Sequence, residues 1–259
     1  MPKKRSERPF TLIANWKMNK TISQAKEYAE KLPALFSDIK SSIWLSVPFT
    51  SIQSVRASLP EQFRVGAQNM NDASGGAFTG EVAAEMIADV GGDFVLLGHS
   101  ERRFYFHESD EFINKKVLRA LESSLSPVLC IGETFEEREE GKTKEVLTRQ
   151  LSIGLTSVRK EDIDRCLIAY EPVWAIGTGK SATSEIVLDT HGMVRSSIAS
   201  LYGEESAQSI PVLYGGSVSP SSAEELSKIE GVDGFLVGTA SLDAETFAKI
   251  AQLSQNSTK

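Results

Sequence analysis

Three side chains in the sequence have the chemistry of a proton-transfer site: a carboxylate, an imidazole and an ammonium group. Glu171 follows the apolar run 166–170. A carboxylate at the tip of a buried strand is costly unless the fold uses its charge. His99 and Lys17 also follow short apolar runs, and Asn15 precedes Lys17. A glutamate base suits abstraction of a proton next to a carbonyl group, because the imidazole, ammonium and amide groups can stabilise the enediolate oxygens.

Each of these residues alone has an ordinary structural explanation. A lone histidine is more often a hydrogen-bonding group of the fold, a lone glutamate can be an ion-pair partner, and a lone lysine is usually solvated. The functional interpretation therefore depends on Glu171, His99 and Lys17 lying on one rim.

Glycine-rich loops indicate a site for an anion. Two further apolar runs end in the segments 214–217 (Tyr-Gly-Gly-Ser) and 236–239 (Leu-Val-Gly-Thr). Glycine lets the backbone approach a phosphate closely, and the N–H groups at the start of a short helix bind it. Tight βα turns are the alternative for either loop alone, but the two together favour a phosphate site. A third glycine loop at 177–180, after the stiff Pro172, predicts a hinged flap beside Glu171.

The letters around this flap also fit two nucleotide-binding motifs, and their context excludes both. The segment 177–182 matches a dinucleotide fingerprint, but five residues, 172–176, separate it from Glu171 at the end of the strand, and the later acidic residue is missing. Gly179-Lys180-Ser181 ends like a P-loop, yet Trp174 occupies the place of the first glycine. The sequence shows neither paired histidine or cysteine ligands nor a Gly-x-Ser-x-Gly elbow. We therefore expect no metal and no cofactor.

Eight short apolar runs, alternating with stretches of helical periodicity, must position these groups. The runs are 10–14, 43–47, 63–67, 94–97, 127–131, 166–170, 210–214 and 234–237, and the main helical stretches are 22–36, 81–90, 110–125, 137–158, 186–201, 221–228 and 244–253. This alternation predicts a parallel sheet covered by helices, and eight units in about 250 residues predict a closed (β/α)8 barrel. A doubly wound open sheet is the alternative, but the glycine fingerprint after its first strand is absent. Barrel enzymes place their chemistry at the carboxyl ends of the strands, where these polar residues stand.

The composition of the chain limits its structural class, its partners and its compartment. The chain has 259 residues, is 41% hydrophobic and carries a net charge of −7, which is typical of a globular protein and argues against a general nucleic-acid binder. We expect one domain over residues 1–259, with residues 1–8 as a flexible basic tail. No apolar run is long enough for a membrane span, so we expect no membrane contact. Two cysteines cannot form a disulfide framework, which favours the cytoplasm.

Four motifs make the chain resemble the triosephosphate isomerase family. They are Asn15-Trp16-Lys17-Met18-Asn19, Gly98-His99-Ser100-Glu101-Arg102-Arg103, Cys130-Ile131-Gly132-Glu133-Thr134 and the segment 169–180. The resemblance extends from Phe10 to Leu242. It implies a TIM barrel and a cofactor-independent isomerase of glycolysis and gluconeogenesis, which interconverts dihydroxyacetone phosphate and D-glyceraldehyde 3-phosphate.

The resemblance also implies a role for each site residue. Glu171 would move the proton between two carbons, and His99 would polarise the carbonyl as a neutral imidazole. Lys17 and Asn15 would hold substrate oxygens, with Glu101 anchoring Lys17. The phosphate would bind the N–H groups of Gly177, Ser217, Gly238 and Thr239. The flap and clamp residues would be Pro172, Val173, Trp174, Ala175, Ile176, Lys180, Tyr214 and Leu236, with Glu133 contacting Trp174 when the flap is open and Cys130 packing beneath the site.

A homodimer is part of the same implication. The loop 68–80 would project into a second subunit, where Thr79 would approach Asn15 and Lys17 across the interface. Thr239 departs from the family pattern, which commonly has a second glycine at that position. A β-branched residue resists positive φ, so we expect phosphate binding to survive if the backbone keeps φ negative.

Two other functions fit parts of the pattern. Another phosphate-binding barrel, such as an aldolase or a biosynthetic isomerase, is the enzymatic alternative; an aldolase needs a Schiff-base lysine on a strand, and no strand interior has one. A barrel that only binds a partner would be expected to lack Glu171, His99 or Lys17, and all three are present.

Overall fold

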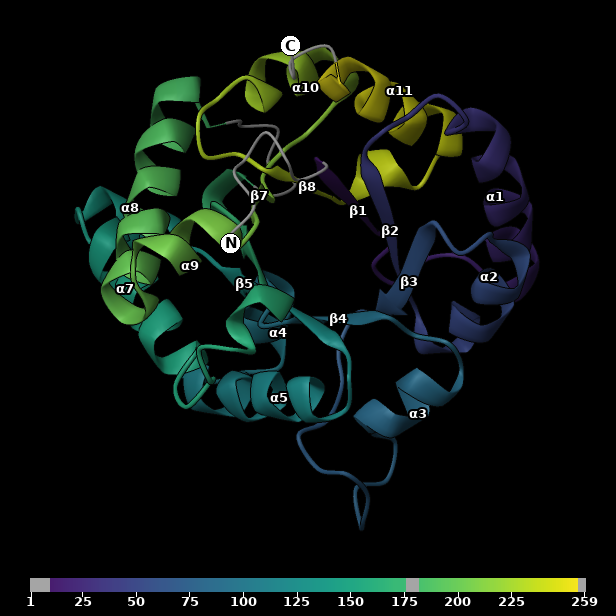
Figure 1. Ribbon diagram of the computed structural model, residues 1–259, viewed down its shortest axis with the longest axis horizontal. Coiled ribbons are helices and arrows are strands. Elements are labelled where there is room, and N and C mark those ends of the chain that lie inside the picture. Colours follow the sequence, from purple (N-terminus) through teal and green to yellow (C-terminus); the bar gives the residue numbers. More distant parts are fainter. Residues whose placement is uncertain (1–9, 176–181, 256–259) are drawn as a thin grey trace.

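The computed structural model describes residues 10–175 and 182–255 of the chain. Within these ranges, parallel strands β1 to β8 follow one another around a closed barrel, and β8 pairs with β1 (Figure 1). The strands are β1 (Thr11–Asn15), β2 (Ser42–Val47), β3 (Phe63–Ala67), β4 (Phe94–Leu97), β5 (Ser126–Ile131), β6 (Leu167–Tyr170), β7 (Val212–Tyr214) and β8 (Gly234–Val237). The predicted (β/α)8 barrel is confirmed, and the open doubly wound sheet is wrong.

Helices surround the barrel and cover the outer face of its strands (Figure 1). They are α1 (Ile22–Leu35), α2 (Ile52–Ser58), α3 (Ala84–Asp89), α4 (Ser100–Tyr105), α5 (Asp110–Glu122), α6 (Phe135–Glu139), α7 (Thr143–Gly154), α8 (Ser184–Tyr202), α9 (Glu204–Ser209), α10 (Pro220–Ser227) and α11 (Ala244–Gln255). Short 3-10 turns lie at η2 (Phe49–Ser51), η3 (Ile163–Arg165), η4 (Val173–Ala175) and η5 (Thr239–Ser241).

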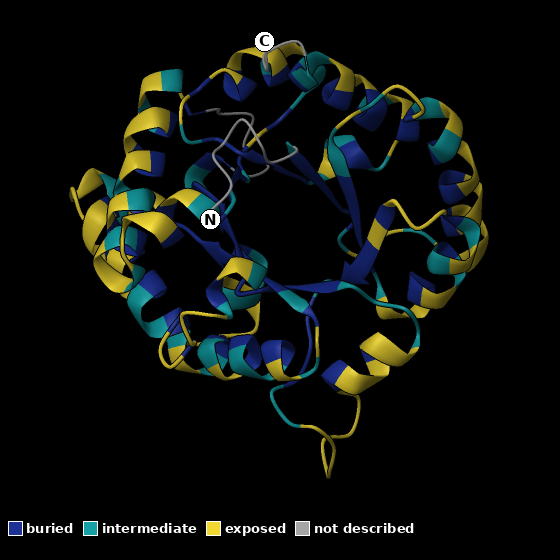
Figure 2. Cartoon of the chain, viewed as in Figure 1, coloured by how far each residue is buried: buried dark blue, intermediate teal, exposed yellow. Residues whose placement is uncertain are grey.

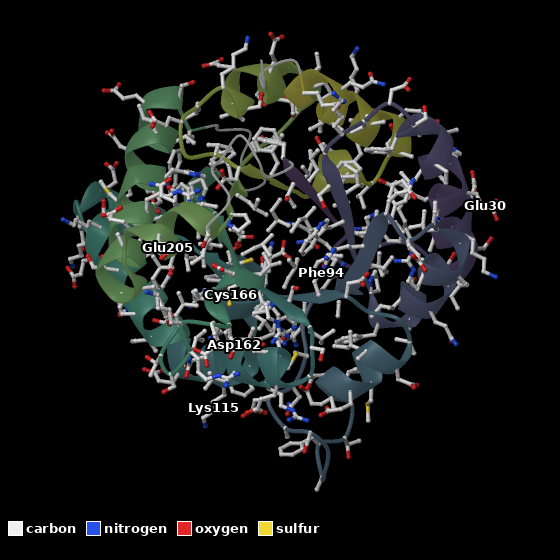
Figure 3. All side chains as sticks on the ribbon, viewed as in Figure 1. Glu30, Phe94, Lys115, Asp162, Cys166 and Glu205 are labelled. Atoms are coloured by element: carbon white, nitrogen blue, oxygen red, sulfur yellow. The ribbon has the colours of Figure 1, made fainter. Side chains whose placement is uncertain are left out.

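The core has two parts, one on each side of the strands. Figure 2 shows buried strands and helices whose inner faces are buried and outer faces exposed. Inside the barrel, side chains such as Trp44, Phe94 and Leu213 pack into one cluster, so the interior is filled and not a channel. In Figure 3, Phe94 lies toward the middle of the barrel and Glu30 at its outer edge. The outward-facing apolar residues of the strands pack on the helices, which explains why the strands are apolar on both faces.

Two predicted elements differ from the structure, and one short helix beside the site was not predicted. The stretch 137–158 is not one helix, because Gly141 adopts a left-handed φ of 70° between α6 and α7. The strand predicted at 210–214 begins at Val212, since the N–H of Ile210 caps α9 by bonding to Ser206. The helix α4 was not predicted, because its short polar sequence after β4 carries no apolar periodicity.

One loop projects from the ring of helices. It joins β3 to α3 (Figure 1), and its residues 74–80 are exposed. The Phe78 side chain in this loop is half-exposed.

Across residues 10–175 and 182–255, every helix is too short or too polar to cross a membrane.

Candidate active site

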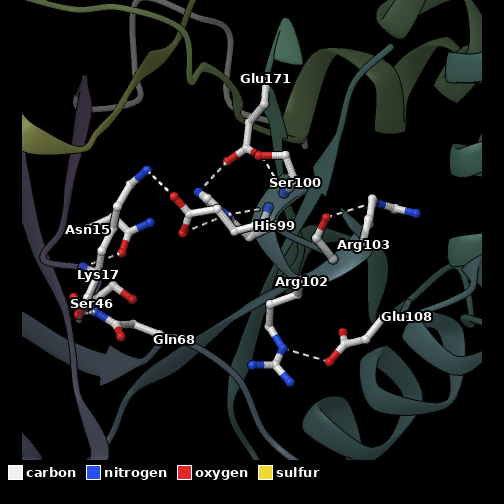
Figure 4. A network of polar contacts seen from close by, with 12 residues as sticks. Asn15, Lys17, Ser46, Gln68, His99, Ser100, Arg102, Arg103, Glu108 and Glu171 are labelled. Carbon is white, nitrogen blue, oxygen red and sulfur yellow. Dashed lines mark hydrogen bonds and ion pairs between the residues drawn. The ribbon is translucent and has the colours of Figure 1, made fainter. Parts of the chain in front are cut away.

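Glu171 stands at the carboxyl end of β6 as a buried carboxylate. Its side chain is 2% exposed, and its Oε2 accepts a hydrogen bond of 3.0 Å from the backbone N–H of Ser100. Its Oε1 lies 3.3 Å from His99 Nε2, and Figure 4 shows the carboxylate pointing toward both residues. A Cβ on Gly215 would lie 2.8 Å from Glu171 Cγ, so glycine at 215 makes room for the glutamate. The carboxylate is therefore held in one position beside an imidazole.

His99 is the N-cap of helix α4. Its Nδ1 accepts a hydrogen bond of 3.2 Å from the backbone N–H of Glu101. A ring nitrogen that accepts a hydrogen bond carries no proton, so this geometry assigns a neutral ring with its proton on Nε2. The Nε2–H group then faces Glu171 and the interior of the site. This arrangement suits a hydrogen-bond donor to a substrate oxygen.

Lys17 is held in a strained backbone position after β1. Its φ is 51°, in the left-handed region that a residue with a Cβ enters at a cost. Its backbone N–H donates to Asn15 Oδ1 at 3.0 Å, and its carbonyl accepts from Gln68 Nε2 at 2.8 Å. The ammonium donates to Glu101 Oε1 at 2.5 Å. Gln68 was not among the predicted site residues, and its position directly after β3 was the only signal in the sequence.

A cavity of about 430 Å³ brings the predicted groups together. Its lining includes Asn15, Lys17, His99, Glu171, Gly215, Gly216, Ser217, Leu236, Gly238 and Thr239, which come from the ends of β1, β4, β6, β7 and β8. Thr239 begins η5 and is not among the residues with positive φ, so it enters the turn without left-handed strain. A Cβ on Gly238 would lie 3.3 Å from Lys17 Cε, so the lysine stem passes directly over this glycine.

The first part of the predicted flap packs beside the site. Pro172 follows Glu171, and Val173, Trp174 and Ala175 form η4. Trp174 Nε1 donates to Glu133 Oε1 at 3.0 Å, and the Arg138 guanidinium lies 5.0 Å from the Trp174 ring. Three other predicted residues, Ile176, Gly177 and Lys180, lie outside the described residues.

Two buried residues, Tyr214 and Cys130, lie next to the site without lining its cavity. Burial raises the pKa of Tyr214 to about 12, against a smaller opposite effect from the backbone of Ala182. Burial and the nearby Glu171 carboxylate raise the pKa of the Cys130 thiol well above its usual value, while Arg103 opposes the shift. Cys130 belongs to the cluster inside the barrel, so it supports the floor of the site.

A second cavity, of about 370 Å³, adjoins the first. Lys17, His99 and Glu101 line it together with apolar side chains that include Met18 and Phe106. Met18 is 96% exposed and Phe106 is 63% exposed, so this side of the site is open. Thr79 lies in the exposed loop and is not among the residues that line either cavity.

Among the residues that the structure describes, no group of three histidine, cysteine, aspartate or glutamate side chains could hold a metal ion.

Comparisons with known proteins agree with this geometry. The family model described as triosephosphate isomerase matches residues 10–254. The triosephosphate isomerase of Protochlamydia amoebophila is 47% identical over 246 residues, covering 95% of this chain and 93% of the relative. That of Fusobacterium nucleatum is 45% identical, with 94% and 98% covered, and that of Clostridium botulinum (strain ATCC 19397) is 44% identical, with the same two shares covered. The chain therefore belongs to the triosephosphate isomerase family and is an isomerase.

Proposed function

We propose that this enzyme interconverts dihydroxyacetone phosphate and D-glyceraldehyde 3-phosphate without a cofactor. The observation that carries the proposal is the arrangement of Glu171, His99 and Lys17 around one cavity whose other side consists of glycine turns. A base, a neutral donor and a cation are the groups that an enediolate requires, and the turns offer N–H groups to a phosphate.

The chemical step follows from the positions of these groups. Glu171 takes a proton from C1 of dihydroxyacetone phosphate, and the electron pair of that C–H bond forms the carbon–carbon double bond of the enediolate. The charge that develops on the former carbonyl oxygen is stabilised by His99 Nε2–H and the Lys17 ammonium. Glu171 then returns the proton to C2, where the electron pair of the carbon–carbon double bond forms the new C–H bond. The proton of the C1 hydroxyl passes to the oxygen on C2, so that C1 becomes the aldehyde and C2 carries the hydroxyl of D-glyceraldehyde 3-phosphate. Asn15 assists in holding the substrate oxygens.

Glu171 must release Ser100 before it acts as the base. The hydrogen bond of 3.0 Å from the Ser100 N–H occupies Oε2 and holds the carboxylate at the end of β4. Movement of the adjoining flap, which starts at Pro172, would free the carboxylate and place Leu236 against it. The hydrogen bond from Trp174 to Glu133 would break in the same movement. Closure then excludes water from a reactive phosphorylated intermediate.

The phosphate grip uses backbone N–H groups from three loops. The proposed donors are the N–H groups of Gly177, Ser217, Gly238 and Thr239. The side chains of Tyr214 and Lys180 would hold the flap in its closed position. A threonine at 239 keeps its N–H in this role, because its backbone does not adopt positive φ. The lysine stem over Gly238 keeps a positive charge near the anion.

We also propose that the enzyme works as a cytoplasmic homodimer. The exposed loop with Phe78 and Thr79 would enter the second cavity of a partner subunit, where Thr79 would approach Asn15 and Lys17. The exposed Met18 and Phe106 beside that cavity support such a contact, since large apolar side chains are normally covered. The two cysteines, Cys130 and Cys166, are free and buried, which agrees with a reducing compartment.

Turnover of D-glyceraldehyde 3-phosphate, with the product coupled to an NADH-dependent reductase, tests the reaction. We expect kcat/KM of about 10⁸ M⁻¹s⁻¹, near the diffusion limit. The reaction in deuterated water should place deuterium on the product carbon, and the isosteric Glu171→Gln variant should lose turnover while staying folded. A folded wild-type protein without turnover would refute the proposal. Covalent trapping by borohydride would instead identify an aldolase.

Sedimentation velocity tests the dimer. Phe78→Asp should place a charge in the apolar contact and convert the dimer to a monomer of low activity. A matched control is Leu188→Asp, which changes an exposed side chain on α8, away from the loop. A wild-type protein that sediments as a monomer at micromolar concentration would contradict this assembly.

A further inference from the structure

Lys20 occupies a backbone position that favours glycine. Its φ is 73°, so a residue with a Cβ is strained there. Backbone strain of this kind persists where surrounding contacts hold the residue in place, and strained residues cluster at functional sites. Lys20 is three residues beyond Lys17, on the same loop after β1.

The side chain of Lys20 spans the gap between the first and last βα units. Its Nζ donates to the carbonyl oxygen of Leu242 at 2.7 Å. The ammonium also lies 4.6 Å from the centre of the Tyr28 ring and 5.3 Å from that of the Trp16 ring, which are cation–π distances. Burial lowers the pKa of Lys20, and the carboxylates of Asp243 and Glu27 oppose that shift. These contacts offset the backbone strain.

The acceptor of this hydrogen bond lies directly after η5, whose residues Thr239 and Ala240 line the first cavity. Leu242 itself lines an outer cavity of about 350 Å³, together with Lys20 and Tyr28. Leu242 is the C-cap of η5, and its N–H bonds to the Thr239 carbonyl at 3.1 Å. The preceding carbonyl, of Ser241, accepts from the Tyr28 hydroxyl at 2.8 Å. Two donors from the first βα unit therefore hold the far end of a turn whose first residues line the cavity. The helices α1 and α11 that flank this junction lie side by side (Figure 1).

The same two loops also meet at their inner ends. The Lys17 stem passes over Gly238, where a Cβ would lie 3.3 Å from Lys17 Cε. The turn therefore has the Lys17 stem beside its first end, at Gly238, and the Lys20 hydrogen bond at its other end, at Leu242. A shift of the turn by a fraction of an ångström would misdirect its N–H groups.

We propose that Lys20 and Tyr28 are positioning residues that fix the turn Thr239–Ser241 against the loop after β1, so that the N–H groups of Gly238 and Thr239 point at the anion beside Lys17. This inference rests on the proposed function, because the anion would be the substrate phosphate. Neither side chain touches the substrate; both act through the turn.

The test replaces the ammonium and keeps the stem. Lys20→Met retains the packing on Trp16 and Tyr28 but removes the donor to Leu242, and Lys20→Arg restores a donor and a cation. Lys31→Met is the matched control, because Lys31 lines the same outer cavity and its ion pairs with described residues are long, at 3.8 Å to Glu27 and 3.9 Å to Glu245.

We expect Lys20→Met to raise KM for D-glyceraldehyde 3-phosphate about fivefold, and the inhibition constant of inorganic phosphate by about the same factor. Its kcat should stay within about twofold of wild type, because the backbone N–H groups bind the phosphate equally well in the ground state and the transition state. Lys20→Arg should recover both constants, and Lys31→Met should leave them unchanged. A lower melting temperature with unaltered KM and phosphate inhibition would overturn the inference and leave Lys20 a purely structural residue.

A second variant and a second assay keep the inference testable in every case. If Lys20→Met does not fold, Tyr28→Phe removes only the donor to Ser241 and should raise the same constants about threefold. Calorimetric titration with inorganic phosphate measures the grip without turnover. If the wild-type protein had no turnover but Lys20→Met still weakened its phosphate affinity, the proposed reaction would be refuted and the positioning role supported. An active wild type whose phosphate affinity neither variant changes would sink the positioning role alone.

Discussion

The substitution Glu171→Asp shortens the proposed base by one methylene group, about 1.5 Å. The structure leaves the protein little means of compensating. The backbone N–H of Glu171 bonds to Ile131 at 2.7 Å, and the N–H of Gly215 bonds to the Tyr170 carbonyl at 2.7 Å, so the backbone on both sides is fixed. The side chain is almost fully buried, so the surrounding atoms keep the shorter carboxylate from moving toward the substrate.

The size of the effect follows from this geometry. A reacting pair needs to approach to about 3–3.5 Å, and a displacement of about 1 Å costs roughly 10²-fold in rate. We expect kcat to fall by about that factor, which corresponds to about 3 kcal/mol in the barrier. KM should change by less than about threefold, because the phosphate grip lies on other loops.

The coupled NADH assay measures both constants, and circular dichroism checks that the variant is folded. The isosteric Glu171→Gln variant is the control for a site with the right shape and no base, and its turnover should fall well below that of Glu171→Asp. Turnover of Glu171→Asp within twofold of wild type would refute the reasoning, since the base would then not depend on reach. If both variants lost the same share of turnover, the cause would be a defect in folding or in substrate binding and not the reach of the base.

Three further predictions concern other parts of the molecule. Burial raises the pKa of both thiols, that of Cys166 to about 12, so Cys130 and Cys166 should resist iodoacetamide at pH 8 until urea unfolds the protein; mass spectrometry that finds fast native alkylation would contradict this. Lys116→Met should lower the free energy of unfolding by about 2 kcal/mol in urea titrations, because buried Glu108 and Asn69 each lose a donor while Arg102 still pairs with Glu108, and an unchanged value would show the pair to be dispensable. Thr239→Gly should change KM by less than about threefold, because the native threonine is unstrained; a tenfold fall in KM would mean that the threonine impairs the grip.

The sequence by itself determined the architecture and the rim on which the polar residues stand. Apolar runs and amphipathic stretches record local periodicity, and parallel strands all end on the same side of a barrel. For that reason the sequence predicts Glu171, His99 and Lys17 on one rim. The motifs around them were long enough to identify the family.

The tertiary structure alone decided how these groups are held. The hydrogen bond from Gln68 to Lys17 and that from Lys20 to Leu242 join segments far apart in the chain, and no local pattern specifies such partners. The contact between the Ser100 N–H and Glu171 likewise depends on the barrel bringing the ends of β4 and β6 together. Local periodicity sets the type of an element, whereas the partner of each side chain is set by closure of the barrel.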